Sequence, residues 1–105
     1  MSKVWHFIVF RTAPDVTRER VNEIRSRFEA CVGPCDGLEW VRSGSNTSPS
    51  EFARGWPEGL VMQFRDAAAR DAYLVHPMHL AISQDARGSY YIDLVVCDME
   101  VEPVS

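Results

Sequence analysis

The sequence predicts a single α+β domain, spanning residues 1–105, made of two successive strand–helix–strand units. Apolar, β-branched and aromatic runs typical of strands lie at residues 4–10, 37–43, 58–64 and 90–100. A stretch with apolar residues at helical spacing follows the first run, and an alanine-rich stretch follows the third. This order predicts a ferredoxin-like βαββαβ plait, an antiparallel sheet with both helices on one face.

The first strand, residues 4–10, is apolar on both faces. One face carries Val4, His6, Ile8 and Phe10, and the other carries Trp5, Phe7 and Val9. His6 is the only polar side chain in this run, so it requires a hydrogen-bond partner or a ligand when the strand is buried.

The first helix has a start signal, an apolar stripe and a stop signal. Thr17 suits the N-cap position, and Gly33-Pro34 ends the helix. The stripe consists of Val21, Ile24, Phe28 and Cys31. The strand at 37–43 is expected to alternate, with Leu38, Trp40 and Arg42 on one face and Glu39, Val41 and Ser43 on the other.

The segment 44–57 is rich in small and polar residues and predicts a long loop. We expect Phe52 and Trp56 to pack it down against the domain. Because Ser, Asn, Gly and Pro favour mobile turns, we also expect this loop to gate a cavity.

Pro77 divides the second helical stretch. Asp66 suits the N-cap of a helix over 67–75. Proline disfavours helix in the residue before it and can open a helix itself. We therefore expect the first piece to end near Val75 or His76 and a second piece to run from Pro77 to about Ala86, with the tail 101–105 fraying or covering an edge.

Composition excludes several classes of function. The net charge is −4, and Lys3 is the single lysine, so no basic surface for nucleic acid or an anionic membrane is expected. The N-terminus lacks a secretion signal and no stretch is long enough to span a membrane, which predicts a cytoplasmic protein. The three cysteines are expected to be reduced thiols, and no zinc set is complete.

The outer face of the sheet is expected to form an interface. Helices of this fold cover one side only, yet Trp5, Phe7 and Val9 make the other side apolar. Exposed apolar surfaces of this size mark interaction sites. Two copies that press these faces together would close a homodimeric α+β barrel with the helices outside.

The segment from Tyr73 to His79, Tyr-Leu-Val-His-Pro-Met-His, places two imidazoles and a phenol within seven residues. The expected break at Pro77 would set Tyr73 and His79 on two short helices that meet at a corner. Such a corner can direct both side chains into one cavity, where they can move protons near neutral pH. His76 and His79 are alternatively a helix cap and an ordinary packed histidine.

These residues resemble the stress-responsive dimeric α/β-barrel (Dabb) family over nearly the whole chain. The resemblance is carried by residues 6–10, 44–48, Gly55, the segment 73–79 and Cys97-Asp98-Met99. It implies a homodimer with a cavity between sheet and helices in each subunit. The family includes plant polyketide cyclases that work without metal or cofactor, and a hydroxynitrile lyase. The cyclase pattern places the catalytic pair on Tyr73 and His79 and a pocket histidine on His6.

The residues and the resemblance together predict a cofactor-free lyase or cyclase acting on a hydrophobic carbonyl compound, polyketide-like or aromatic. His79 would act as the general base, and Tyr73 would donate a hydrogen bond to the carbonyl oxygen. His6 could hold His79 in one tautomer or bind a second oxygen. The expected wall of the pocket consists of Ile8, Phe10, Ile24, Phe28, Leu60, Met62 and Ile82.

Two other classes of function stay open. One is a non-catalytic ligand-binding or stress-response dimer with structural histidines. The other is a haem or oxygen-using monooxygenase, for which the sequence carries no signature beyond a possible axial histidine. A metal site would draw on His76 and His79, which lack a nearby carboxylate and make a poor ligand set.

Overall fold

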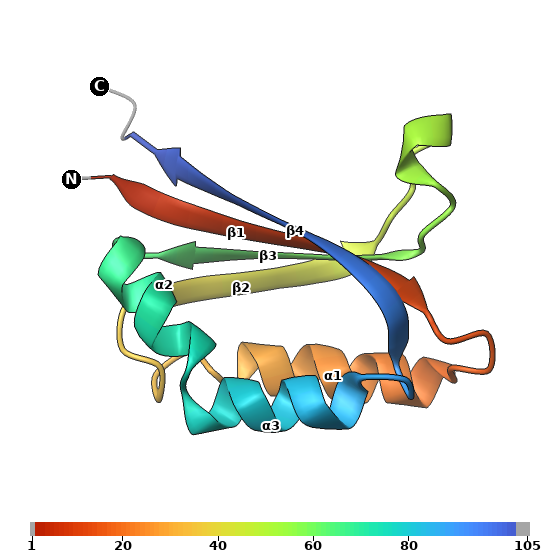
Figure 1. The fold of residues 1–105 in the computed structure, drawn as a ribbon, viewed down its shortest axis with the longest axis horizontal. Coiled ribbons are helices and arrows are strands. Elements are labelled where there is room, and N and C mark those ends of the chain that lie inside the picture. The colour runs from red at the N-terminus through yellow and green to blue at the C-terminus, as the bar shows by residue number, and fades with distance from the viewer. Residues whose placement is uncertain (1, 103–105) are drawn as a thin grey trace.

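The computed structural model describes residues 2–102, which form one four-stranded antiparallel sheet (Figure 1). The strands are β1 (Lys3–Thr12), β2 (Leu38–Ser45), β3 (Glu58–Phe64) and β4 (Tyr91–Val101). They lie side by side in the order β2-β3-β1-β4. Each strand–helix–strand unit thus joins strands that are not neighbours, as the ferredoxin-like plait requires. Of the expected fraying tail, Val101 belongs to β4, Glu102 follows the strand, and 103–105 lie outside the described residues.

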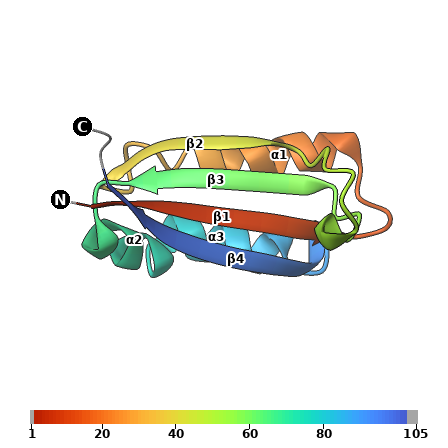
Figure 2. The same ribbon diagram turned by 90° about the horizontal axis from the view of Figure 1, so that it is seen from above.

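The helices all cover the same face of the sheet (Figure 2). They are α1 (Arg18–Glu29), α2 (Ala67–Leu74) and α3 (Pro77–Ala86), and a short 3-10 helix, η1 (Glu51–Ala53), lies in the β2–β3 connection. The α+β plait and the one-sided helix layer predicted from the sequence are confirmed. Within residues 2–102, no helix has the length and apolar character needed to cross a membrane.

The alternation of β1 sorts its side chains as predicted. Val4, His6, Ile8 and Phe10 are buried beneath the helices. Within residues 2–102, no α-helix covers the opposite face (Figure 1). Trp5, Phe7 and Val9 point to that face and remain half-buried. They are joined there by exposed apolar residues of β4, including Val95 and Met99. The apolar outer face therefore continues across two strands.

The expected strict alternation of β2 is wrong. A β-bulge shifts the register between Leu38 and Trp40. Because one extra residue then faces the partner strand, Leu38 and Val41 both reach the core. Trp40 and Arg42 lie together on the outer face, with the Arg42 guanidinium 5.4 Å from the Trp40 ring centre.

The helix boundaries follow their capping chemistry. Thr17 accepts a hydrogen bond from the Arg20 N–H, and Asp66 accepts one from the Ala69 N–H at 2.8 Å. His76 is the N-cap of α3. The Nδ1 atom of His76 accepts a hydrogen bond from the Met78 N–H at 3.1 Å. Since Pro77 has no N–H to satisfy, it fits the first position of that helix.

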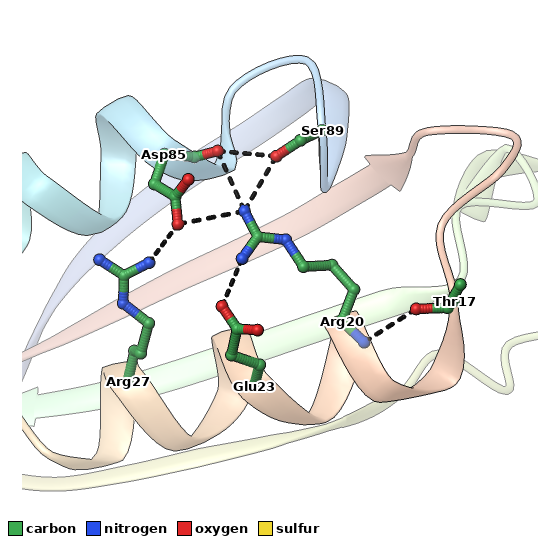
Figure 3. A network of polar contacts seen from close by, with 6 residues as sticks. All are labelled: Thr17, Arg20, Glu23, Arg27, Asp85 and Ser89. Carbon is green, nitrogen blue, oxygen red and sulfur yellow. Dashed lines mark hydrogen bonds and ion pairs between the residues drawn. The ribbon is translucent and has the colours of Figure 1, made fainter.

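A polar network on the outside of the helix layer joins α1 to α3 (Figure 3). The Arg20 guanidinium donates to the Asp85 backbone carbonyl at 3.1 Å and to the Ser89 hydroxyl at 3.0 Å. Arg27 lies about two helical turns further along α1 and pairs with the Asp85 carboxylate. These contacts fix the C-terminal end of α3 against α1.

The β2–β3 connection does not pack down as expected. It rises from the end of the sheet on the side away from the helices (Figure 1). Phe52, on η1, is 85% exposed, and Trp56 is half-buried. Local polar contacts order this segment without any apolar anchor for Phe52.

Candidate functional site

A cavity of about 490 Å³ lies between α3 and the helix-facing side of β1 and β4. Because β4 is an edge strand, the helices leave this side of it partly open. Most of the wall is apolar, and polar groups gather at its two ends. The lining residues are His6, Ile8, Phe10, Phe28, Leu74, His79, Ser83, Ala86, Arg87, Tyr91, Ile92, Asp93, Leu94, Val96 and Asp98.

The expected wall and the lining of this cavity share only some residues. His6, Ile8, Phe10 and Phe28 line the cavity, but Ile24, Leu60, Met62 and Ile82 do not. The strand order is the reason: β3 lies on the far side of β1 from β4, so Leu60 and Met62 fill the core instead. The wall on the open side comes from β4, which the sequence-based wall left out.

The β2–β3 connection is not a lid on this cavity. None of its residues is among the lining residues, and it stands on the opposite side of the sheet (Figure 1). The expected gating is therefore wrong, because the loop and the cavity are separated by the whole thickness of the sheet.

His79 lies at the start of α3 with one ring nitrogen engaged and one free. Its Nδ1 is 3.0 Å from the Leu74 backbone oxygen, which only accepts, so Nδ1 carries the proton and donates. Nε2 is then left with its lone pair. Burial lowers the pKa of His79, the hydrogen bond to Leu74 opposes this shift, and the nearby His6 adds to it. The ring is therefore uncharged at neutral pH, and its Nε2 is able to accept a proton.

Tyr73 is packed among aromatic rings next to His79. Its ring centre lies 4.5 Å from that of His79, 5.2 Å from that of Phe64 and 6.2 Å from that of His6. Only 1% of the residue is exposed, and among residues 2–102 its hydroxyl has no hydrogen-bond partner. Burial raises the pKa of Tyr73 well above its usual value, so the phenol keeps its proton. Tyr73 is not among the residues that line the cavity.

A charged chain reaches the cavity through His6. Its Nδ1 lies 2.5 Å from the Asp98 carboxylate, whose other oxygen accepts a hydrogen bond from Arg70 at 2.6 Å. The carboxylate accepts a hydrogen bond from Nδ1, so Nδ1 carries a proton and Nε2 points away from Asp98. His6 thus has the partner that its buried position required.

Asp98 is a site residue that the sequence-based wall missed. It sits directly opposite His6 in the β1–β4 register. The signal was present as an unpaired polar residue in β1, but 92 residues separate the two side chains. Nothing local in the sequence indicates which acidic residue of the last strand faces it.

The polar groups do not form an evident metal centre. Within the described part of the chain, no three His, Cys, Asp or Glu side chains cluster as ligands. His76, one of the two histidines considered for a metal, has its Nδ1 committed to the cap of α3.

A family model described as the stress responsive A/B barrel domain (Dabb) matches residues 4–101. The chain belongs to this family. The resemblance carried by the segment 73–79 and the strand ends is therefore confirmed at the level of the family. No curated protein sequence matches the chain.

Many solved structures are similar to this Dabb protein over almost their full lengths, among them the following three. An Arabidopsis thaliana protein has 20% identity and a TM-score of 0.86, covering 97% of this chain and 98% of that one. A dimeric ferredoxin-like protein of unknown function from Jannaschia has 25% identity and a TM-score of 0.82, covering 94% and 99%. A hydroxynitrile lyase from Passiflora edulis has 13% identity and a TM-score of 0.83, covering 98% and 96%. At these identities the likeness concerns the fold.

Proposed function

We propose that this Dabb protein is a cofactor-independent lyase or cyclase that acts on a hydrophobic carbonyl compound. The observation that carries the proposal is the contact between Tyr73 and His79, whose ring centres lie 4.5 Å apart. One is a neutral imidazole with a free Nε2, and the other a protonated phenol with an unpaired hydroxyl. A base and a hydrogen-bond donor are the two groups that enolate chemistry needs.

His79 Nε2 would remove a proton from the carbon next to the substrate carbonyl. The electron pair of the broken C–H bond moves into the enolate, whose oxygen accepts a hydrogen bond from Tyr73. In an aldol ring closure, the enolate carbon attacks a second carbonyl of the same molecule, and the new alkoxide takes the proton back from His79. The proton is conserved, so this sequence of steps balances without a redox partner.

The unpaired hydroxyl supports this role for Tyr73. A buried hydroxyl without a partner costs about 1–3 kcal/mol, and most native structures avoid one. Because Tyr73 does not line the cavity in this structure, a substrate oxygen would supply the missing partner only after the Tyr73 ring turns toward the cavity.

The cavity supports an apolar substrate of moderate size. A volume of about 490 Å³ falls in the range of small-molecule sites. Its middle is lined by Ile8, Phe10 and Val96, which suit an acyl chain or an aromatic ring. The hydroxynitrile lyase among the structural neighbours shows that this fold can carry lyase chemistry, which supports the proposal.

A non-catalytic ligand-binding dimer is the second candidate, and one observation favours it. Tyr73 does not line the cavity, so a ligand could fill this space without meeting the phenol. In that case His6 and His79 would serve as polar anchors for a bound carbonyl compound.

We also propose a homodimer formed through the outer face of the sheet. Trp5, Phe7, Val95 and Met99 leave this face apolar and uncovered in a single copy. The dimeric Jannaschia neighbour supports this arrangement.

Purified protein should be incubated with linear β-polyketones and with aromatic cyanohydrins, and products followed by mass spectrometry. Binding of the same compounds should be measured by calorimetry. Turnover above the buffer rate that is lost in His79→Ala supports the enzyme. Binding without turnover assigns the ligand-binding role, and neither binding nor turnover contradicts both.

A further inference from the structure

Gly44 and Gly59 face each other across β2 and β3 without a local reason to be glycine. Neither has a positive φ, so any residue could adopt these backbone conformations. A Cβ added at Gly44 would meet no atom within 4 Å, and one at Gly59 would meet only the Gly44 oxygen at 3.9 Å. A strand-interior glycine often marks a place where another group approaches the backbone closely.

The missing side chains leave a hollow in the outer face of the sheet. Gly59 pairs with Val9, so this glycine pair shares the face of Phe7 and Val9, away from the helices. The hollow has a volume of about 300 Å³, and on this face its walls are Phe7, Val9, Val61 and Arg42. No side chain among residues 2–102 fills it.

The β2–β3 connection forms an ordered arm above the same face. The Asn46 N–H donates to the Pro57 carbonyl at 2.8 Å, and the Asn46 side chain donates to the Trp56 carbonyl at 2.9 Å, which closes the base of the arm. At its tip, Ser50 caps η1 by accepting a hydrogen bond from the Phe52 N–H at 3.1 Å. Phe52 is thus a large aromatic side chain held out in solvent by a preformed turn.

A buried ion pair fixes the arm to the domain. Glu58, the first residue of β3 after the arm, accepts hydrogen bonds from Arg25 Nε at 3.0 Å and Nη2 at 2.7 Å. Only 4% of Glu58 is exposed. The arm therefore leaves the sheet from a fixed point.

We infer that Phe52 of one copy docks into the Gly44–Gly59 hollow of a second copy. The arm stands over the end of β1, whereas the hollow lies over β2 and β3, at the same end of the sheet (Figure 2). A twofold axis parallel to the strands leaves the position along the strands unchanged. It places the β1 side of one sheet opposite the β2 and β3 side of the other. It therefore brings each arm onto the partner's hollow, and each copy supplies both halves of the contact. The inference rests on the proposed homodimer and is independent of any catalysis.

The test is a double-mutant cycle on the dimer dissociation constant, measured by analytical ultracentrifugation over a dilution series. Phe52→Ser removes the inserted ring, and Gly44→Val fills the hollow with a residue that strands favour. Each single change should weaken the dimer at least tenfold, and the double variant should be no weaker than the weaker single one. Val75→Ser is the matched control, because Val75 is 71% exposed and far from the outer face.

Two results would overturn the inference. If Phe52→Ser leaves the dissociation constant unchanged, the hollow receives some other group. If the two effects multiply in the double variant, the ring and the hollow do not meet. Circular dichroism and thermal midpoints verify the fold, and Gly44→Ala replaces Gly44→Val if the latter is unfolded. A monomeric wild type would contradict the dimer and this contact, while leaving the cavity chemistry to its own assay.

Discussion

Burial shifts the pKa values of His79 and Tyr73 in opposite directions and leaves both side chains uncharged. It lowers the pKa of His79, which removes the proton from imidazolium, and it raises the pKa of Tyr73, which keeps the proton on the phenol. A histidine and a tyrosine side by side in one apolar layer therefore become a base and a donor. The same surroundings act on both residues, and the chemistry of each group decides the outcome.

Loss of either group should lower turnover without unfolding the domain. Tyr73→Phe keeps the ring and removes one donor, which typically lowers a rate by about a hundredfold to a thousandfold. His79→Ala removes the base, an effect on the order of a hundred- to ten-thousandfold. Steady-state kinetics on folded variants provide the measurement, with His76→Ala as the control. Wild-type rates in Tyr73→Phe and His79→Ala, together with a loss of turnover in His76→Ala, would contradict this assignment and point to His76 instead.

The pH profile should report the ionisation of His79. The neutral ring is the base, so activity falls as pH drops through the pKa of His79 in the folded protein. Because burial lowers that pKa below its ordinary value, the fall should come at more acidic pH than for a free histidine. Stability changes in the same direction, since the unfolded chain takes up this proton more readily at low pH. A profile that already falls between pH 8 and 7 would contradict the assignment.

At the scale of the elements, the break at Pro77 positions the site. Pro77 has no N–H to continue the hydrogen bonds of α2, so that helix ends before it. His76 then caps the next helix, α3. The carbonyl of Leu74, freed at the end of α2, accepts the His79 hydrogen bond that fixes its tautomer. The helix junction thus both places the His79 imidazole and determines which of its two nitrogens is left without a hydrogen bond to the backbone.

His76→Ala should reduce stability and leave turnover close to wild type. The change removes the acceptor for the Met78 N–H, and loss of an N-cap typically costs about 0.5–2 kcal/mol. Urea unfolding gives the free energy of unfolding for the variant, with Gln84→Ala, an exposed position in the same helix, as the control. His76→Asn should recover most of the loss, because asparagine is a good N-cap. Equal stability in His76→Ala and the wild type would show that the cap contributes nothing.

At the scale of the whole molecule, the one-sided helix layer leaves the outer face of the sheet to be covered by something else. Trp5 and Phe7 pack edge to face with ring centres 6.0 Å apart, and Trp40 joins them at 5.9 Å from Trp5. This aromatic group is too large and continuous for a typical solvent-facing sheet. A second copy in the proposed dimer would cover it without requiring any further element from this chain.

Phe7→Asp should therefore give monomeric or insoluble protein. A single charge at the centre of the outer face would be buried and unpaired in the dimer. Light scattering at micromolar concentration should find twice the 11.9 kDa chain mass for the wild type and for Val75→Asp, the exposed control. A wild-type mass near that of one chain would contradict the proposed dimer.

Local sequence determined the elements of this protein and the two faces of β1. The spacing of Val21, Ile24 and Phe28 specifies the buried side of α1, and period-two alternation sorts His6 from Phe7. Pro77 broke the helix where expected, because its ring and missing N–H act on the residues beside it. Each of these outcomes depends on interactions within about one or two turns of the chain.

Only the tertiary structure decided which distant residues meet. Strand register set Asp98 opposite His6, and the strand order moved the cavity wall from Leu60 and Met62 to β4. The bulge that buries Val41, and the placement of Phe52 on the face away from the cavity, likewise depend on how whole strands pair. Periodicity within a strand specifies its two faces, whereas the neighbour across the ladder is chosen by packing of the complete chain.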